Sequence, residues 1–188
     1  MSRFIKHITF CFGILFCLNN SFAAAIYYSS VDYGCADSLG VENIIHKKNE
    51  LHVVHEDGSI HAVDLNNNVI WGFRNKWGED YRFDKSNKSW RIIEYGKISV
   101  FVDPKKIAAS TDNPDIAPGY QDSPYELNKY HRYALTPDGE LIKYSRKRFL
   151  KGLESDPALR KRFLKILNEQ PANLLLYIMK YNADLWLE

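Results

Sequence analysis

The stretch of sequence that decides the fold reads LHVVHEDGSIHAVDLNNNVIWGF and spans residues 51–73. Its β-branched and aromatic runs are typical of strands. Asp57-Gly58 lies between two of these runs and strongly indicates a hairpin, because the tight turn needs positive φ. Asn66-Asn67-Asn68 predicts a second turn, since Asn tolerates the left-handed region. We therefore predict a three-stranded antiparallel meander with strands at residues 51–55, 60–64 and 69–73.

The same alternation of short apolar runs and turns continues towards the C-terminus. It predicts further strands at residues 81–83, 90–94 and 98–102, and a last hairpin within residues 130–144 around Asp138-Gly139. Residues 110–124 are rich in Asp, Asn, Pro, Gly and Ser, which predicts a long surface loop. Loops of this length inside a compact domain are often functional.

A helical period replaces the strand pattern after Tyr144. Ser155-Asp156-Pro157 predicts a helix start, and Pro171 separates this helix from a second one over about residues 173–185. We predict an α+β fold in which an antiparallel β-meander of about 6–8 strands is followed by a C-terminal α-helical hairpin. Residues 26–188 are expected to form a single domain, β-rich over 26–144 and helical over 145–188.

The first 25 residues have the features of a cleavable signal peptide. Arg3 and Lys6 precede an apolar run over residues 8–18, and small residues follow at Ala23-Ala24-Ala25. Cleavage after Ala25 fits best, and cleavage after Ala23 is the alternative. Because a membrane span needs about 20 apolar residues, this run predicts secretion, most simply to the periplasm, and no transmembrane segment in the mature chain.

Removal of residues 1–25 leaves 23 basic and 23 acidic side chains, which are unevenly distributed. Residues 143–188 carry 10 basic and 5 acidic side chains, and residues 26–142 carry 13 and 18. A nucleic-acid-binding protein would be basic as a whole, so no nucleic-acid partner is expected. The basic helices instead predict an acidic protein partner, or an anionic membrane surface. The candidate binding residues are Arg146, Lys147, Arg148, Arg160, Lys161 and Arg162.

A solvated helix face that rests on an acidic sheet is the simpler explanation of the same basic residues. Trp77 is a further candidate binding residue, because it lies in a polar loop among aromatic residues that could stack on sugar rings. Those aromatic residues would otherwise form a buried core, which is their usual role. They are Trp71, Phe73, Trp77, Tyr81, Phe83 and Trp90.

Two further residue sets are weak candidates for chemistry. Cys35 is the only cysteine outside the signal segment and could serve as the nucleophile of a Cys-dependent hydrolase if an imidazole activated it, but a buried Cys is commoner. The Asp57-Gly58 turn predicts a register with His52 opposite Val63, which would place His52 and His61 on one sheet face as weak candidate metal ligands. Because no ligand-spacing motif accompanies them, we predict no metal and no cofactor.

Residues 56–64, closing on Val69-Ile70-Trp71, resemble one blade repeat of quinoprotein-type β-propellers. That family repeats a strand, an Asp-Gly turn, a strand ending in Ala-x-Asp, another turn, and an aliphatic pair with Trp. The resemblance covers residues 51–73 and implies a twisted meander there. It carries over no functional residue.

The absence of a catalytic constellation favours a binding protein over an enzyme. We expect an exported interaction protein, such as an inhibitor or immunity protein acting on a secreted toxin or hydrolase. A Cys35-dependent cell-wall hydrolase and a glycan-binding module are the alternatives. The hydrolase requires a His beside the thiol, and the glycan module requires two exposed coplanar aromatic rings.

Overall fold

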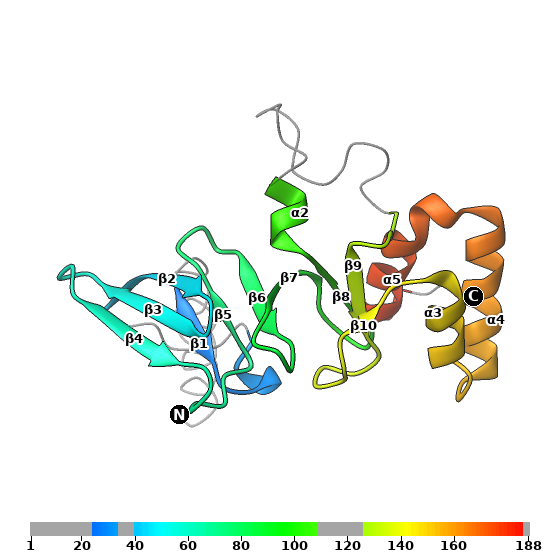
Figure 1. Cartoon of the computed structure of the whole chain (residues 1–188). Helices are drawn as coiled ribbons and strands as arrows, with labels where there is room; N and C mark the ends of the chain where they lie inside the picture. Colours follow the sequence, from blue (N-terminus) through cyan, green and yellow to red (C-terminus); the bar gives the residue numbers. More distant parts are fainter. Residues whose placement is uncertain (1–23, 34–39, 109–125, 186–188) are drawn as a thin grey trace, which may run out of the picture. The chain divides into compact units, whose positions relative to one another are not determined.

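The computed structural model describes residues 24–33, 40–108 and 126–185. The chain divides into two compact units, one ending at Lys88 and the other beginning at Ser89. Antiparallel strands occur in both units, and the C-terminal helices belong to the second (Figure 1). The predicted α+β class, with a β-meander and C-terminal helices, is therefore confirmed. Cys35 and the predicted loop over residues 110–124 lie outside the described residues.

The first unit contains two sets of antiparallel strands. In one set β3 lies between β2 and β4, and in the other β5 lies between β1 and β6. Ser30–Asp32 forms a short 3₁₀ turn, η1. The strands are β1 (Ala25–Tyr27), β2 (Val41–Lys47), β3 (Glu50–His55), β4 (Ile60–Asp64), β5 (Gly72–Arg74) and β6 (Asp80–Phe83).

The third strand of the predicted meander does not pair with the second. The strand begins at Gly72 and pairs with β1 and β6 instead of β4. The reason lies in the asparagine turn. The Asp64 carboxylate accepts hydrogen bonds from the side chains of Asn66 and Asn67, and the Asp64 carbonyl accepts one from Asn68. These contacts shape a wider loop that leaves the β4 edge, so the Asn run is not a two-residue hairpin turn.

The predicted register of the β3–β4 hairpin is wrong by one residue. Val54 lies opposite Ile60 and His52 lies opposite Ala62. The His55 N–H donates to the Ser59 carbonyl, and the Gly58 N–H donates to the His55 carbonyl. Gly58 has φ +80°, and residues 56–58 form a three-residue loop that ends in this left-handed residue. The loop length sets which residues of β3 and β4 lie opposite each other. His52 and His61 therefore lie on opposite faces of the sheet.

The same kind of turn recurs twice more in the first unit. Each of the segments 75–79 and 84–88 has the same two backbone hydrogen bonds. The N–H of its first residue donates to the carbonyl of its fifth residue, and the N–H of its fourth residue donates to the carbonyl of its first residue. The fourth residues, Gly78 and Asn87, have φ values of +74° and +58°. Three hairpin turns of one type are thus built from short local sequence signals.

The second unit is a four-stranded meander with helices on one face. Its strands are adjacent in chain order from β7 to β10. Buried Val100 and Tyr133 from the sheet and Phe149, Phe163 and Leu174 from the helices share one apolar core. The elements are β7 (Ser89–Glu94), β8 (Ser99–Val102), α2 (Pro104–Ala108), β9 (His131–Ala134), β10 (Ile142–Lys143), α3 (Arg146–Gly152), α4 (Pro157–Glu169), η2 (Pro171–Asn173) and α5 (Leu174–Asn182).

The predicted helix start at Pro157 is confirmed, and its cap is visible. The Asp156 carboxylate accepts a hydrogen bond of 2.9 Å from the Leu159 N–H, as an N-cap side chain does. The second predicted helix begins at Leu174. An additional helix, α3, precedes them and is capped by Ser145, whose side chain accepts from the Arg148 N–H. None of the helices among the described residues is long and apolar enough to cross a membrane.

The Asn182 side chain hydrogen-bonds the end of α5 to the turn between β7 and β8. Its side chain accepts from the Ile98 N–H at 2.9 Å and donates to the Ile98 carbonyl and to the Glu94 carboxylate, each at 2.8 Å. Gly96 leaves room for this contact, because a Cβ there would lie 2.5 Å from Asn182 Cγ. The helical layer is therefore bonded to the sheet at a defined point.

His131, at the start of β9, is expected to make the second unit less stable in acid. Burial lowers the pKa of His131 from 6.5 to about 4, so between these values the unfolded chain binds the proton more readily. The stabilisation is complete above about pH 6.5 and is lost as the pH falls towards 4, by about 1–3 kcal/mol. Urea unfolding at pH 7 and pH 4.5 checks this. In His131→Gln the difference between the two pH values should shrink by that amount, and an unchanged difference would contradict the prediction.

Candidate functional site

The basic residues of α3 and α4 fall into two groups with different roles. The first group, Arg146 and Arg160, bonds the two helices to each other. Arg146 donates to the Leu167 carbonyl at 3.3 Å and to the Asn168 side chain, and Arg160 Nε donates to the Leu150 carbonyl at 3.2 Å. Each arginine thus satisfies a carbonyl near the C-terminal end of the other helix, where intrahelical partners run out. Two of the six predicted binding arginines and lysines therefore have a structural role.

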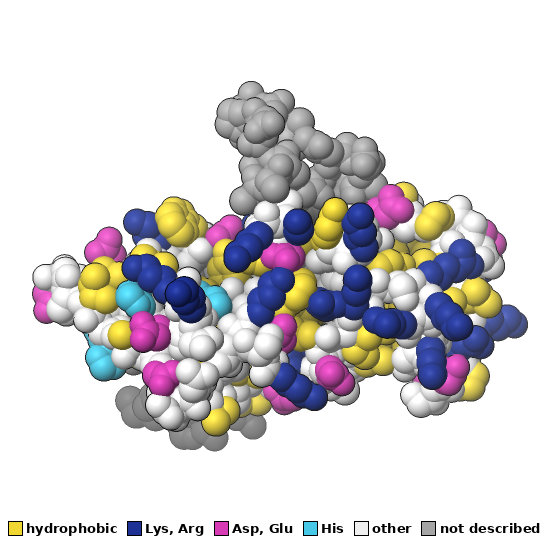
Figure 2. All heavy atoms as spheres, viewed as in Figure 1, with side chains coloured by type: hydrophobic (Ala, Val, Ile, Leu, Met, Phe, Trp, Pro, Cys, Tyr) yellow, Lys and Arg dark blue, Asp and Glu magenta, His cyan; other side chains and the backbone are white. Residues whose placement is uncertain are grey.

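The second group points into solvent. All of its members are exposed, and the described residues place no side-chain hydrogen bond or ion pair on them. Lys161 and Lys165 are four residues apart and therefore share one face of α4, as Lys147 and Lys151 share one face of α3. Figure 2 shows Lys and Arg side chains gathered over these helices. We call this group the basic helical surface; it consists of Lys147, Arg148, Lys151, Lys161, Arg162 and Lys165.

The inner faces of the same helices are apolar. Phe149, Phe163 and Leu167 are buried against Val100 and Tyr133 of the sheet. The solvated-face explanation had the helices resting on an acidic sheet, but the sheet residues beneath them are apolar. The basic helical surface is therefore a solvated face, on the side of α3 and α4 opposite to their apolar core.

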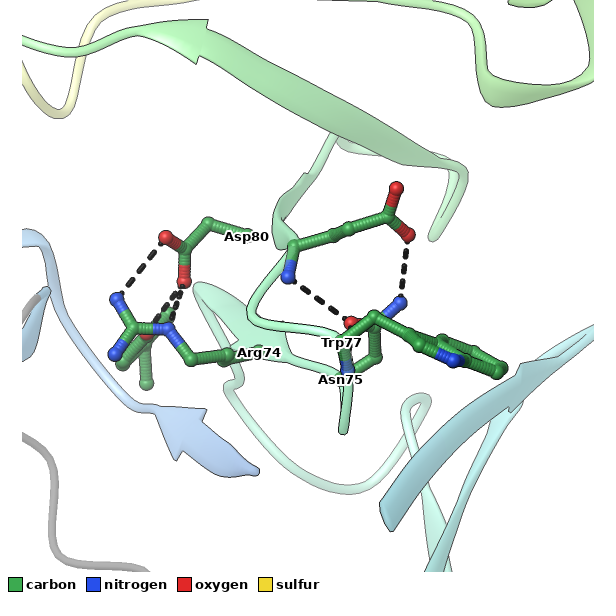
Figure 3. Close-up of polar contacts among 6 residues, drawn as sticks. Arg74, Asn75, Trp77 and Asp80 are labelled. Atoms are coloured by element: carbon green, nitrogen blue, oxygen red, sulfur yellow. Dashed lines mark hydrogen bonds and ion pairs between the residues drawn. The ribbon is translucent and has the colours of Figure 1, made fainter. Parts of the chain in front are cut away.

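Trp77 lies at the tip of the β5–β6 hairpin and is 68% exposed. The loop beneath it is held by Asn75, which is itself buried. Asn75 Oδ1 accepts from the N–H groups of Trp77 and Glu79, both at 3.0 Å, and its amide donates to the Glu79 carboxylate at 2.8 Å. Figure 3 shows these contacts and the Trp77 ring extending away from Arg74 and Asp80. The exposed tryptophan therefore lies on a loop whose backbone is hydrogen-bonded to a buried side chain.

A mostly buried ion pair closes the base of this loop. Arg74 Nε and Nη2 donate to the two carboxylate oxygens of Asp80 at 2.8 and 3.0 Å, and Tyr27 Oη donates to the same carboxylate at 2.6 Å. The hydrogen bond to Asp80 raises the pKa of Arg74, while burial, together with Asp80, raises the pKa of Tyr27. Arg74 and Asp80 were not predicted from the sequence. Their directly opposed positions, on either side of an Asn-Lys-Trp-Gly turn, are the signal that could have found them.

The other aromatic candidates are buried or partly buried in the sheets. Phe73, Phe83 and Trp90 are 3%, 8% and 5% exposed, and the Tyr81 ring stacks on Phe73 at 4.8 Å. Of the six aromatic residues considered for sugar stacking, Trp77 alone is exposed. The pair of coplanar exposed rings that a glycan-binding module needs is therefore not formed by this set.

The histidine candidates do not come together. His52 and His61 lie on opposite sheet faces, and His52 Nε2 contacts the Glu50 carboxylate at 3.1 Å. No group of three or more His, Cys, Asp or Glu side chains within the described residues could hold a metal ion. Cys35 lies outside those residues, so its predicted catalytic role stays a prediction.

No protein-family model, curated protein or solved structure matches this chain.

Proposed function

We propose that this chain is an exported interaction protein that binds an acidic protein partner through the basic helical surface. The observation that carries the proposal is the exposed, unpaired charge of six basic side chains on α3 and α4. Complementary charge raises the rate of encounter and excludes partners of the wrong sign. Because Arg146 and Arg160 fix the two helices to each other, this charge is held on a defined scaffold.

Export is supported by the order of residues at the N-terminus, where two basic residues, an apolar run and small residues follow one another. An inhibitor or immunity protein of a secreted toxin or hydrolase would act in that compartment. Such proteins work by occluding another protein and need no catalytic group of their own. A surface of solvated basic side chains on α3 and α4 is compatible with that way of working.

A pair of charge variants tests the proposal. Lys161→Gln with Lys165→Gln should weaken the affinity for the partner about tenfold, since each of these exposed contacts contributes about 0.5–1 kcal/mol or more. The partner is first retrieved with the tagged wild-type protein from periplasmic extract. Affinities are then measured by calorimetry at low and at high salt, and the variant should also show the weaker salt dependence.

Lys47→Gln with Lys48→Gln is the matched control, because both lysines are exposed in the first unit and remote in sequence from α3 and α4. It removes the same charge and should leave the affinity unchanged. Equal loss in both double variants would mean that net charge alone matters, and would overturn the proposed surface. Retrieval of no specific partner, together with binding to vesicles containing anionic lipid, would instead identify a membrane surface as the target.

A further inference from the structure

We infer that export removes residues 1–23, so that the mature protein begins with Ala24. The inference rests on the proposed export of the chain and goes beyond it by naming the bond that is cut. The sequence offers two bonds with small residues at the two positions that the peptidase reads. Ser21 and Ala23 precede the bond to Ala24, and Ala23 and Ala25 precede the bond to Ile26. On sequence alone the second bond fits better.

The fold uses the two residues that the second cut would remove. Ala24 is 1% exposed and belongs to the apolar core of the first unit, together with Ile44, Leu51 and Phe73. Ala25 is 4% exposed and is the first residue of β1, where it pairs with Arg74. A cut after Ala25 would delete both buried side chains and one of the three residue pairs that join β1 to β5.

Either cut is a hydrolysis that adds water across the peptide bond and leaves a carboxylate on the released peptide and an ammonium group on the mature chain. The two mature chains therefore differ only in Ala24 and Ala25, the two buried residues that the second cut would delete.

The intact mass of the protein purified from the periplasm of an expressing bacterium tests the inference. We expect the mass of residues 24–188. The mass of residues 26–188 would overturn the inference and leave the proposed export standing. The mass of the full chain, recovered from the cytoplasm, would overturn both, so the two failures are distinguishable.

Substitution at position 21 provides a second test of the physical argument. Ser21→Phe places a bulky side chain at the outer recognition position of the first bond, and we expect the cut to move to the Ala25–Ile26 bond. The shortened protein should then have a lower Tm than the protein beginning at Ala24. Asn20→Phe is the matched control, because position 20 is not one of the two positions read for either bond, and its product should begin at Ala24. A shortened protein with an unchanged Tm would overturn the argument from burial.

Discussion

Replacement of Asp80 by leucine is expected to remove about 3–5 kcal/mol from the free energy of unfolding of the first unit. The Asp80 carboxylate accepts from Arg74 Nε and Nη2 and from Tyr27 Oη, and the side chains of Arg74 and Asp80 are 15% and 12% exposed. Without it the largely buried guanidinium loses the carboxylate that accepts from both its Nε and its Nη2, and removing one partner of a buried ion pair is costly. Urea unfolding followed by tryptophan fluorescence measures the loss.

A triple variant separates the loss of a partner from the loss of the interaction itself. Tyr27→Phe, Arg74→Met and Asp80→Leu together remove the three polar side chains that are bonded to one another and leave apolar side chains of similar volume. Because such replacements are often close to neutral, the triple variant should lie within about 2 kcal/mol of the wild type. If it is as unstable as Asp80→Leu alone, the stability comes from the charged group and not merely from its completeness.

Replacement of Gly72 by alanine is expected to cost about 3 kcal/mol or more, because the new Cβ cannot be accommodated without separating two strands. A Cβ at this position would lie 2.1 Å from the carbonyl oxygen of Tyr81 and 3.2 Å from its carbonyl carbon. Both atoms belong to the backbone of β6, which pairs with β5 at this point, and neither can rotate away. The free energy of unfolding in urea again provides the measurement.

Gly58→Ala is the matched control for steric overlap. Gly58 has φ +80° and nothing within 4 Å of an added Cβ, so only the left-handed backbone is penalised, by about 1–2 kcal/mol. The difference between the two variants therefore isolates the contact between β5 and β6. Equal losses in Gly72→Ala and Gly58→Ala would contradict the close approach of these strands.

Local signals predicted those parts of the fold that depend on neighbouring residues. Asp57-Gly58 identified the β3–β4 hairpin, and Asp156-Pro157 identified the start of α4, because turns and caps are decided within a few residues. The register of the hairpin depends on the number of residues in its loop, which is three in the structure. That number is decided by the left-handed residue Gly58 and cannot be read from the apolar alternation alone.

Long-range pairing was less accessible to the sequence. The run over residues 69–73 looks like the next strand of a meander, but Gly72 permits the close approach of Tyr81, and β5 therefore pairs with β1 and β6. Arg74 and Asp80 look like ordinary solvated charges in a polar loop. In the structure Tyr27, which is far from both in the chain, donates a hydrogen bond to Asp80.

The candidate site was predicted in part. Its basic residues are evident from composition and helical spacing, but the sequence does not distinguish a lysine that faces solvent from an arginine that reaches the end of a neighbouring helix. Arg146 and Arg160 each reach a carbonyl of the neighbouring helix, whereas Lys147 and Lys161 do not. Which residues reach it depends on how α3 and α4 pack against each other. The buried face of α4, by contrast, follows directly from the spacing of Leu159, Phe163 and Leu167.

The division of labour between Arg146 and Arg160 and the remaining cations has an evolutionary consequence. Arg146 and Arg160 bond α3 and α4 to each other, whereas Lys147, Lys151, Lys161 and Lys165 make no such contact, so substitutions at these four lysines can accumulate with little loss of stability. Under the proposed function, specificity for the partner can then diverge between lineages while the contacts between α3 and α4 stay constant. In a set of descendants, variation should concentrate at these four lysines, whereas positions 146 and 160 should keep a side chain able to donate to a helix end.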